Sequence, residues 1–166
     1  LPPLSYTNGE PAGRCRIQGS VIPTRIDMYD ICGGTIDFLW SKTDSCGRSI
    51  AHSQTMTVNP APEPQWVNPP ADITLPCGQT VDPAFMPDLF YSNGVPNGNF
   101  CSINGSVAPT RQNDIQGCSG TVTFTWTYTD PCGRTLNHTQ VYTLSPPDEP
   151  QWINPPADIT VTSCSG

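Results

Sequence analysis

The chain has 166 residues, with 7 Lys and Arg against 14 Asp and Glu, so its formal net charge is −7. This balance leaves no basic patch that could follow a phosphate backbone, which excludes nucleic acid as a partner. The 20 prolines and 14 glycines disfavour long helices and favour short strands joined by turns. No apolar run approaches the roughly 20 residues that cross a bilayer, so we expect no membrane insertion.

The sequence contains an internal repeat. Aligning Cys15 with Cys101 and reading to Thr74 and Thr160 without a gap gives 33 identical residues in 60. An internal repeat of this period indicates two copies of one small unit, which we place at residues 1–80 and 81–166. Units of this size bury a marginal core and often need disulfides.

Each copy opens with a short predicted strand pair, and a longer strand follows it. In the first copy the pair is Cys15–Val21 with Ile26–Ile31, around the Pro-Thr of SVIPT. Next comes TIDFLWSKT at residues 35–43, matched by TVTFTWTYT at residues 121–129. Aromatic and aliphatic residues alternate with polar ones in both, which predicts strands with one core-facing side that holds Trp40 and Trp126.

The motifs TDSCGR and TDPCGR, at residues 43–48 and 129–134, follow these strands and precede the alternating stretches 50–58 and 136–144. We expect two β-hairpins in which Asp44 and Asp130 accept hydrogen bonds from the turn backbone. The glycine of each motif suits a positive φ. His52 and His138 lie in the returning strands, and since no nucleophile or metal cluster accompanies them we expect half-buried structural histidines.

A proline-rich bend follows each hairpin, first NPAPEPQWVNPP and then SPPDEPQWINPP. Each bend leads into a strand signal, ADIT, at residues 71 and 157. Trp66 and Trp152 in the bends either cover the end of a sheet or face outward, where a repeated indole would suit contact with a sugar or a partner. They are the candidate ligand contacts of the chain.

Four cysteines fall in each copy, at positions that repeat: Cys15, Cys32, Cys46 and Cys77, then Cys101, Cys118, Cys132 and Cys164. An even count in small repeated units predicts a disulfide framework formed in an oxidising compartment. The spacing does not fit a zinc site. For calcium the only candidate carboxylates are Asp72 with Glu63, and Asp158 with Asp148 and Glu149, without a dense acidic cluster, so we expect neither a metal nor a cofactor.

The pairing of the cysteines leaves two schemes. Cys32 and Cys46 flank one extended strand, which separates them by roughly 40 Å and prevents a bond between them. The favoured scheme closes all eight within the chain, as Cys15–Cys32, Cys46–Cys77, Cys101–Cys118 and Cys132–Cys164. Its rival gives the segment ADITLPC to the following unit and pairs Cys77 with Cys132.

The repeated motifs occur in a fixed order: C-x-I-x-G-S-V, C-x-G-T, F-x-W-x-x-T-D-x-C-G-R, H-x-Q and PPADIT. Together they resemble the repeats of giant surface adhesins of gliding Bacteroidetes, including the mobile gliding adhesin that the type IX system secretes. They are more distantly similar to hyalin-type immunoglobulin-like repeats.

The resemblance implies an all-β chain of two tandem immunoglobulin-like β-sandwich repeats, each stapled by two disulfides. It implies an extracellular, cell-surface stalk that serves adhesion and gliding motility. The expected partners are neighbouring repeats of the same adhesin and a surface polysaccharide. The alternative function is a carbohydrate-binding accessory module of a secreted protein. An enzyme is not expected, because no paired carboxylates, triad or metal cluster can be recognised.

Overall fold

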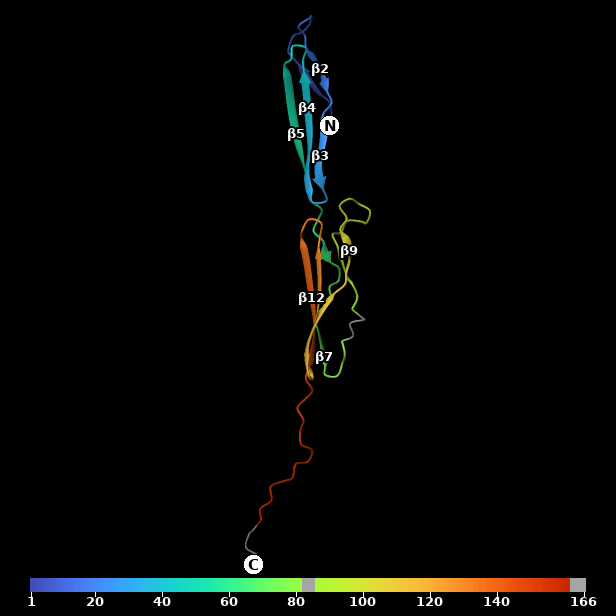
Figure 1. Cartoon of the computed structure of the whole chain (residues 1–166), viewed down its shortest axis with the longest axis vertical. Coiled ribbons are helices and arrows are strands. Elements are labelled where there is room, and N and C mark those ends of the chain that lie inside the picture. Colours follow the sequence, from blue (N-terminus) through green and yellow to red (C-terminus); the bar gives the residue numbers. More distant parts are fainter. Residues whose placement is uncertain (82–85, 162–166) are drawn as a thin grey trace, which may run out of the picture. The chain divides into compact units, whose positions relative to one another are not determined.

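The structure, a computed structural model, describes residues 1–81 and 86–161, and in that part the regular secondary structure consists of strands alone (Figure 1). The prediction of an all-β chain is therefore confirmed. No helix in the described residues is long and apolar enough to cross a membrane. The strands are β1 Leu4–Thr7, β2 Gln18–Val21, β3 Thr24–Asp30, β4 Gly33–Thr43, β5 Ser49–Val58, β6 Gln65–Trp66, β7 Ile73–Pro76, β8 Leu89–Ser92, β9 Asn104–Val107, β10 Thr110–Gln116, β11 Ser119–Thr129 and β12 Thr135–Ser145.

The sequence repeat is also a repeat of strands. The bounds of β2, β3 and β4 return 86 residues later as those of β9, β10 and β11, and β5 returns as β12. The chain nevertheless divides into two compact units that do not follow the two copies. The first unit contains Leu1–Pro69, Met86–Thr110 and Thr125–His138, and the second contains Pro70–Phe85, Arg111–Phe124 and Thr139–Gly166. A pair of immunoglobulin-like sandwiches, with a boundary at residue 80, stays a prediction.

A three-stranded antiparallel sheet, in the order β3-β4-β5, belongs to the first unit. Trp40 stands opposite His52 in its β4–β5 register, as the predicted hairpin requires. The predicted pairing of residues 15–21 with 26–31 is wrong, because β2 pairs with β1 and β3 with β4. A tight hairpin turn needs a positive φ, which Pro23 between β2 and β3 cannot adopt.

A second small sheet of the first unit has the order β6-β8-β9. Trp66 in β6 is opposite Tyr91 in β8, and their rings meet edge to face with centroids 6.2 Å apart. The tyrosine in turn lies over Gly105 of β9, where an added Cβ would come within 2.5 Å of the Tyr91 hydroxyl. Glycine is required at this position because the ring occupies the space of a side chain.

The second unit contains β7, most of β10 and the adjoining parts of β11 and β12, in the sheet order β10-β11-β12-β7. Alternate residues of β11 are the most deeply buried side chains described, namely Val122, Phe124 and Trp126. This confirms the core-facing side predicted for residues 121–129. On β4, Phe38 and Trp40 are also buried, which confirms the same prediction for residues 35–43.

The two ADIT segments behave differently. Residues 73–76 form β7, which runs parallel to β12 with Ile73 opposite Tyr142. The segment that we placed at the end of the first repeat thus pairs with a strand of the second. The strand predicted at residues 157–160 is wrong for this structure, which gives those residues no regular structure. A strand needs a partner for its backbone groups, and the described part of the chain supplies none there.

Candidate functional site

The repeated turn motif builds a well-ordered hairpin in both copies. In TDPCGR the Asp130 carboxylate accepts hydrogen bonds from the backbone N–H groups of Cys132 and Arg134, both at 2.9 Å. Asp44 does the same for Cys46 and Arg48. The turn glycines have φ of 79° and 78°. These contacts confirm the turn chemistry predicted from the sequence.

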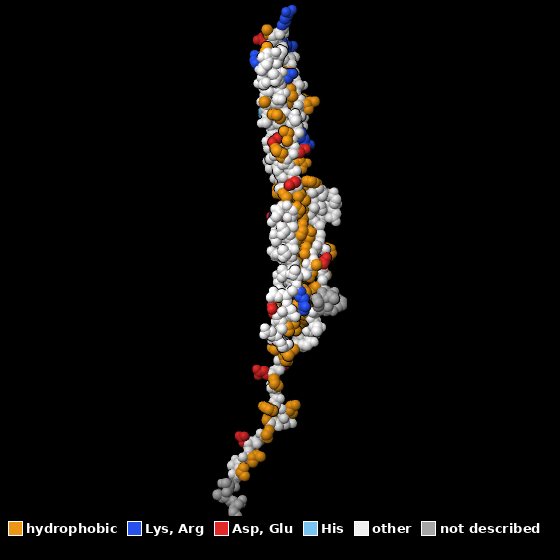
Figure 2. All heavy atoms as spheres, in the orientation of Figure 1, with side chains coloured by type: hydrophobic (Ala, Val, Ile, Leu, Met, Phe, Trp, Pro, Cys, Tyr) orange, Lys and Arg blue, Asp and Glu red, His pale blue; other side chains and the backbone are white. Residues whose placement is uncertain are grey.

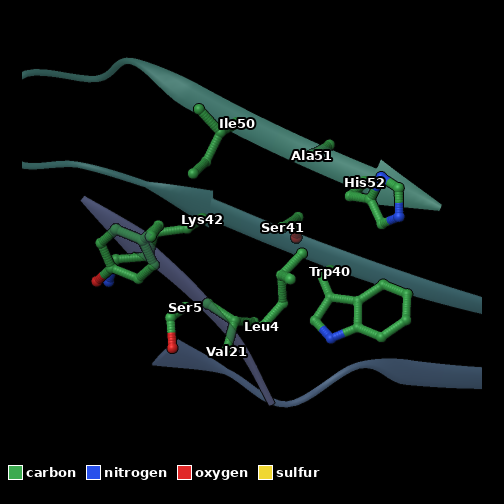
Figure 3. A pocket seen from close by; sticks show the side chains of 10 residues that line it. Leu4, Ser5, Val21, Trp40, Ser41, Lys42, Ile50, Ala51 and His52 are labelled. Carbon is green, nitrogen blue, oxygen red and sulfur yellow. The ribbon is translucent and has the colours of Figure 1, made fainter. Parts of the chain in front are cut away.

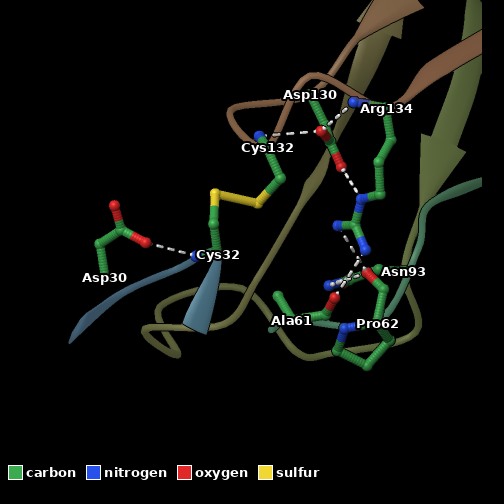
Figure 4. The surroundings of a disulfide bond; sticks show 8 residues. All are labelled: Asp30, Cys32, Ala61, Pro62, Asn93, Asp130, Cys132 and Arg134. Carbon is green, nitrogen blue, oxygen red and sulfur yellow. Dashed lines mark hydrogen bonds and ion pairs between the residues drawn. A yellow bond between two sulfur atoms is a disulfide. The ribbon is translucent and has the colours of Figure 1, made fainter. Parts of the chain in front are cut away.

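Only the second of these turns is covalently anchored. Cys132 is bonded to Cys32, 100 residues earlier, and both lie in the first unit (Figure 4). The Asp30 carboxylate accepts a hydrogen bond of 2.7 Å from the Cys32 N–H and holds that end of the bridge. Cys46 at the equivalent turn is an exposed free thiol.

Arg134 ties the same turn to the chain that follows β5. Its Nε donates to the Asp130 carboxylate at 2.6 Å, and its guanidinium also donates to the carbonyl of Ala61 at 2.9 Å. A longer contact of 3.4 Å reaches the Pro62 carbonyl (Figure 4). Its counterpart Arg48 pairs with Asp44 but keeps a side chain that is 70% exposed. We call Cys32, Ala61, Asp130, Cys132 and Arg134 the turn junction.

The electrostatics of the turn junction follow from its burial. The side chain of Asp130 is fully buried and that of Arg134 is 25% exposed. Desolvation raises the pKa of Asp130, but hydrogen bonds from the backbone and side chain of Arg134 and from Cys132 together lower it, and the net pKa is below the ordinary value. The carboxylate is therefore charged near neutral pH and acts as an acceptor.

Several predicted disulfides are wrong. Because Cys32 and Cys132 bond each other, neither Cys15–Cys32 nor Cys132–Cys164 can form in this structure, and the rival Cys77–Cys132 is excluded as well. Cys164 lies outside the described residues. Five cysteines in the described ranges are free thiols: Cys15, Cys46, Cys77, Cys101 and Cys118. The one bond joins the two copies, so neither copy has an internal disulfide among the described residues, where two were expected.

Two of the free thiols lie together. Cys77, directly after β7, and Cys118, in the turn between β10 and β11, line one hollow in the second unit. The hydrogen bond between the two thiols, assisted by desolvation, raises the pKa of Cys77. Our favoured scheme gave these residues to Cys46 and Cys101 instead. It missed the contact because it assigned Cys77 to the first repeat, whereas β7 carries it to the second.

We predict that Cys77 and Cys118 form a disulfide when the protein is treated with oxidised glutathione. Two thiolates would lose two electrons to one glutathione disulfide, which leaves as two glutathione thiols. The reaction should accelerate with rising pH, because only the thiolate attacks and the pKa of Cys77 is raised. Peptide mapping of the alkylated protein measures it. A Cys118→Ser variant should keep Cys77 alkylatable, and a bond from Cys77 to Cys101 would contradict the pairing.

A shallow apolar hollow of about 80 Å³ lies beside β4 and β5 (Figure 3). Leu4 from β1 and Val21 from β2 face Trp40, and His52 lies against the Trp40 ring with centroids 5.6 Å apart. The volume is far below the 300 Å³ or more of typical ligand pockets. We interpret the hollow as loose packing at the margin of the sheet.

The two candidate tryptophans have different surroundings. Trp66 is half-buried against Tyr91, whereas Trp152 is 90% exposed. A role for either residue in ligand contact stays a prediction. Tyr91 also stacks on Tyr128 with ring centroids 3.7 Å apart, and burial together with a hydrogen bond to Tyr91 raises the pKa of Tyr128 to about 12.

The described residues contain no group of three or more His, Cys, Asp or Glu side chains that could hold a metal ion. The calcium candidate Asp72 instead accepts a hydrogen bond of 2.8 Å from the Val141 N–H. His138 packs against Trp126 with ring centroids 5.7 Å apart, as His52 does against Trp40. The predicted half-burial is confirmed for His138 and wrong for His52, which is exposed on β5. The absence of a cofactor and of catalysis stays a prediction.

The family profile described as HYR-like domain with 4 cysteines matches residues 59–144, slightly more than half of the chain. That range begins before β7 and contains Cys77, Cys101, Cys118 and Cys132. Searches of curated proteins and of solved structures found no match. The hyalin-type part of the sequence resemblance is thereby confirmed, while the gliding-adhesin part stays a prediction. HYR-like domains are extracellular domains of the adhesion type, and a disulfide suits that setting. The chain belongs to the family of HYR-like domains with 4 cysteines.

Proposed function

We propose that the chain is a structural, spacing part of an extracellular adhesin at a cell surface. The observation that carries this proposal is the match to the HYR-like family in a chain whose strands are written twice. A repeated β unit is the means by which surface proteins gain length, since each copy adds a similar folded element to its neighbour. The expected partners are neighbouring repeats of the same adhesin.

The residues that the copies share support a mechanical role. They are the turn Asp, Cys, Gly and Arg, the inward Phe and Trp, and the prolines of the bends. Positions beside this framework differ, with Lys42 in place of Tyr128 and Asp37 in place of Thr123. A binding site used by each repeat would keep its contact residues, and only the bends with Trp66 and Trp152 do so. The strength of the unit lies instead in strand ladders such as β4–β5 and in the turn junction.

The finer part of the proposal is a place in the gliding adhesins that the type IX system secretes. It rests on the order of the repeated motifs in the sequence, from C-x-I-x-G-S-V to PPADIT. The family match is consistent with a cell-surface repeat, but it gives no support for a role in gliding.

A carbohydrate-binding module is the second candidate function. The observation in its favour is that Trp152 and its neighbour Ile153 are each 90% exposed. An exposed indole is a common platform for a sugar ring. One tryptophan alone makes a small platform, which is why we rank this function below the spacer.

A glycan-array experiment with the labelled chain separates the two functions. We expect no glycan to be bound above background, because a spacer needs no sugar site. Trp152→Ala and Trp66→Ala serve as matched variants, one exposed and one packed on Tyr91. Reproducible binding that Trp152→Ala abolishes would reject the spacer in favour of the carbohydrate-binding module.

A further inference from the structure

Strand β12 is completed at its outer edge by a segment from much earlier in the chain. β7 runs parallel to it, with Thr74 opposite Thr143 and Leu75 opposite Leu144. The segment before β7 adds side-chain contacts. Gln140 donates to the Ala71 carbonyl at 2.7 Å, and Asp72 accepts from the Val141 N–H at 2.8 Å. The sequence PPADIT is thus an edge-strand element in this protein.

The counterpart of β12 in the first copy is β5, and its outer edge is open. β5 ends the sheet order β3-β4-β5 in the part of the chain that the structure describes. Its side chains are exposed almost throughout, and Met56, which matches Tyr142, is 44% exposed. Gln54 matches Gln140 and Thr57 matches Thr143. The strand edge that accepts a PPADIT segment is therefore present in both copies, on β5 and on β12, but in the described residues only the β12 edge is paired.

The donor side is also present twice. PPADIT recurs at residues 155–160, followed by Val161 in place of Leu75. Here Ile159 and Val161 are 85% and 83% exposed. Figure 2 shows hydrophobic side chains standing out from this C-terminal segment after β12. Trp152 precedes this segment as Trp66 precedes β7. Trp66 packs against Tyr91.

We propose that residues 157–161 of one copy add to the outer edge of β5 in a second copy, with residues 159–161 as the parallel strand. The register of β7 on β12 places Ile159 opposite Met56, Thr160 opposite Thr57 and Val161 opposite Val58. Each copy then uses its C-terminal segment as donor and its β5 edge as acceptor. The contact is head to tail, so an open assembly of any size keeps one free donor and one free acceptor at its ends.

The physical drive is the completion of an open strand edge. The outward N–H and C=O groups of β5 gain partners, and apolar side chains of both strands leave water. The opposing force is the charge of −7 on each copy, which salt screens. Association should therefore increase with protein concentration and with ionic strength.

The bonding direction of each residue can be read from the occupied copy. The Val141 N–H faces β7, so Thr143, two residues on, faces it too. In a parallel pair its bonds go to the residues that flank its partner Thr74, namely Ile73 and Leu75. Thr57 is then the bonding residue on β5, and Ile159 and Val161 are the bonding residues on the donor.

Sedimentation velocity of the full chain tests the proposal. The mean mass should rise severalfold as the concentration is raised, and Ile159→Pro should abolish the rise, because proline removes a bonding N–H. Thr160→Pro is the matched control: its N–H faces away from β5, so association should persist. A synthetic peptide of residues 151–161 should compete, and a scrambled peptide should not.

A mixing experiment tests the direction of the contact. Thr57→Pro spoils the acceptor edge, and Ile159→Pro spoils the donor. Each variant alone should stay monomeric, while the mixture should form a one-to-one pair and stop there. Circular dichroism and thermal melting check that both variants are folded. A chain that remains monomeric at all concentrations and salt levels, or association that survives Ile159→Pro, would overturn the proposal.

Discussion

Replacing Cys32 and Cys132 together by serine should lower the free energy of unfolding by about 4 to 5 kcal/mol, because the bond closes a loop of some 100 residues. The chain-entropy argument applies because the bridge restricts the unfolded chain far more than the folded one. Unfolding in guanidinium chloride, followed by tryptophan fluorescence, measures the loss. The double variant avoids a lone thiol that could exchange with the free cysteines of the described ranges.

Cys46→Ser provides the matched control for the disulfide. Cys46 holds the equivalent place in the first turn, but its thiol is free and exposed, so its replacement should leave the unfolding midpoint unchanged. If Cys46→Ser destabilised the chain as much as the double variant, the assignment of the bridge to Cys32 and Cys132 would be wrong.

Asp130→Ala should cost about 3 kcal/mol, because it breaks a buried ion pair and leaves two turn N–H groups without their acceptor. Asp44→Ala removes the same turn contacts, but its side chain is 13% exposed and its partner Arg48 is 70% exposed, so water can replace the lost acceptor and the cost should be smaller. Equal losses in the two variants would show that burial of the turn junction contributes nothing.

The pH dependence of stability gives a second readout for Asp130. Its pKa is lower in the folded protein than the ordinary 3.8 of an unfolded chain. The stabilisation is therefore fully present above pH 3.8 and is lost as the pH falls through the lower, folded pKa. Asp130→Asn should flatten this acid dependence. A wild-type protein whose stability does not change between pH 5 and pH 2 would contradict the role of the carboxylate.

Local features of the fold could be predicted because their causes are local. Alternation of apolar and polar residues locates β4 and β11, and the Asp and Gly of TDPCGR specify the turn before β12. The long-range partner of Arg134 could not be found in this way. It is the carbonyl of Ala61, a backbone group that any residue would present, so the sequence carries no signal for it.

The cysteine pairing failed for a different reason. The favoured scheme paired every cysteine within its own copy, on the premise that a unit ends where its motif ends. The premise is wrong because β7, from the end of the first copy, pairs with β12 of the second copy. This pairing places Cys77 beside Cys118. Strand pairing between distant segments depends on which edges are open, and an edge is visible only in the assembled sheet.

The turn junction has a consequence for how the chain would carry tension. A pull on its two termini passes from residue 32 through the disulfide to residue 132 and bypasses everything between them. About 350 Å of extended polypeptide is thereby withheld from stretching for as long as the bond is intact. Reduction of this single bond would make that length available for extension. The redox state of the surroundings therefore sets the maximum length to which the chain can be stretched.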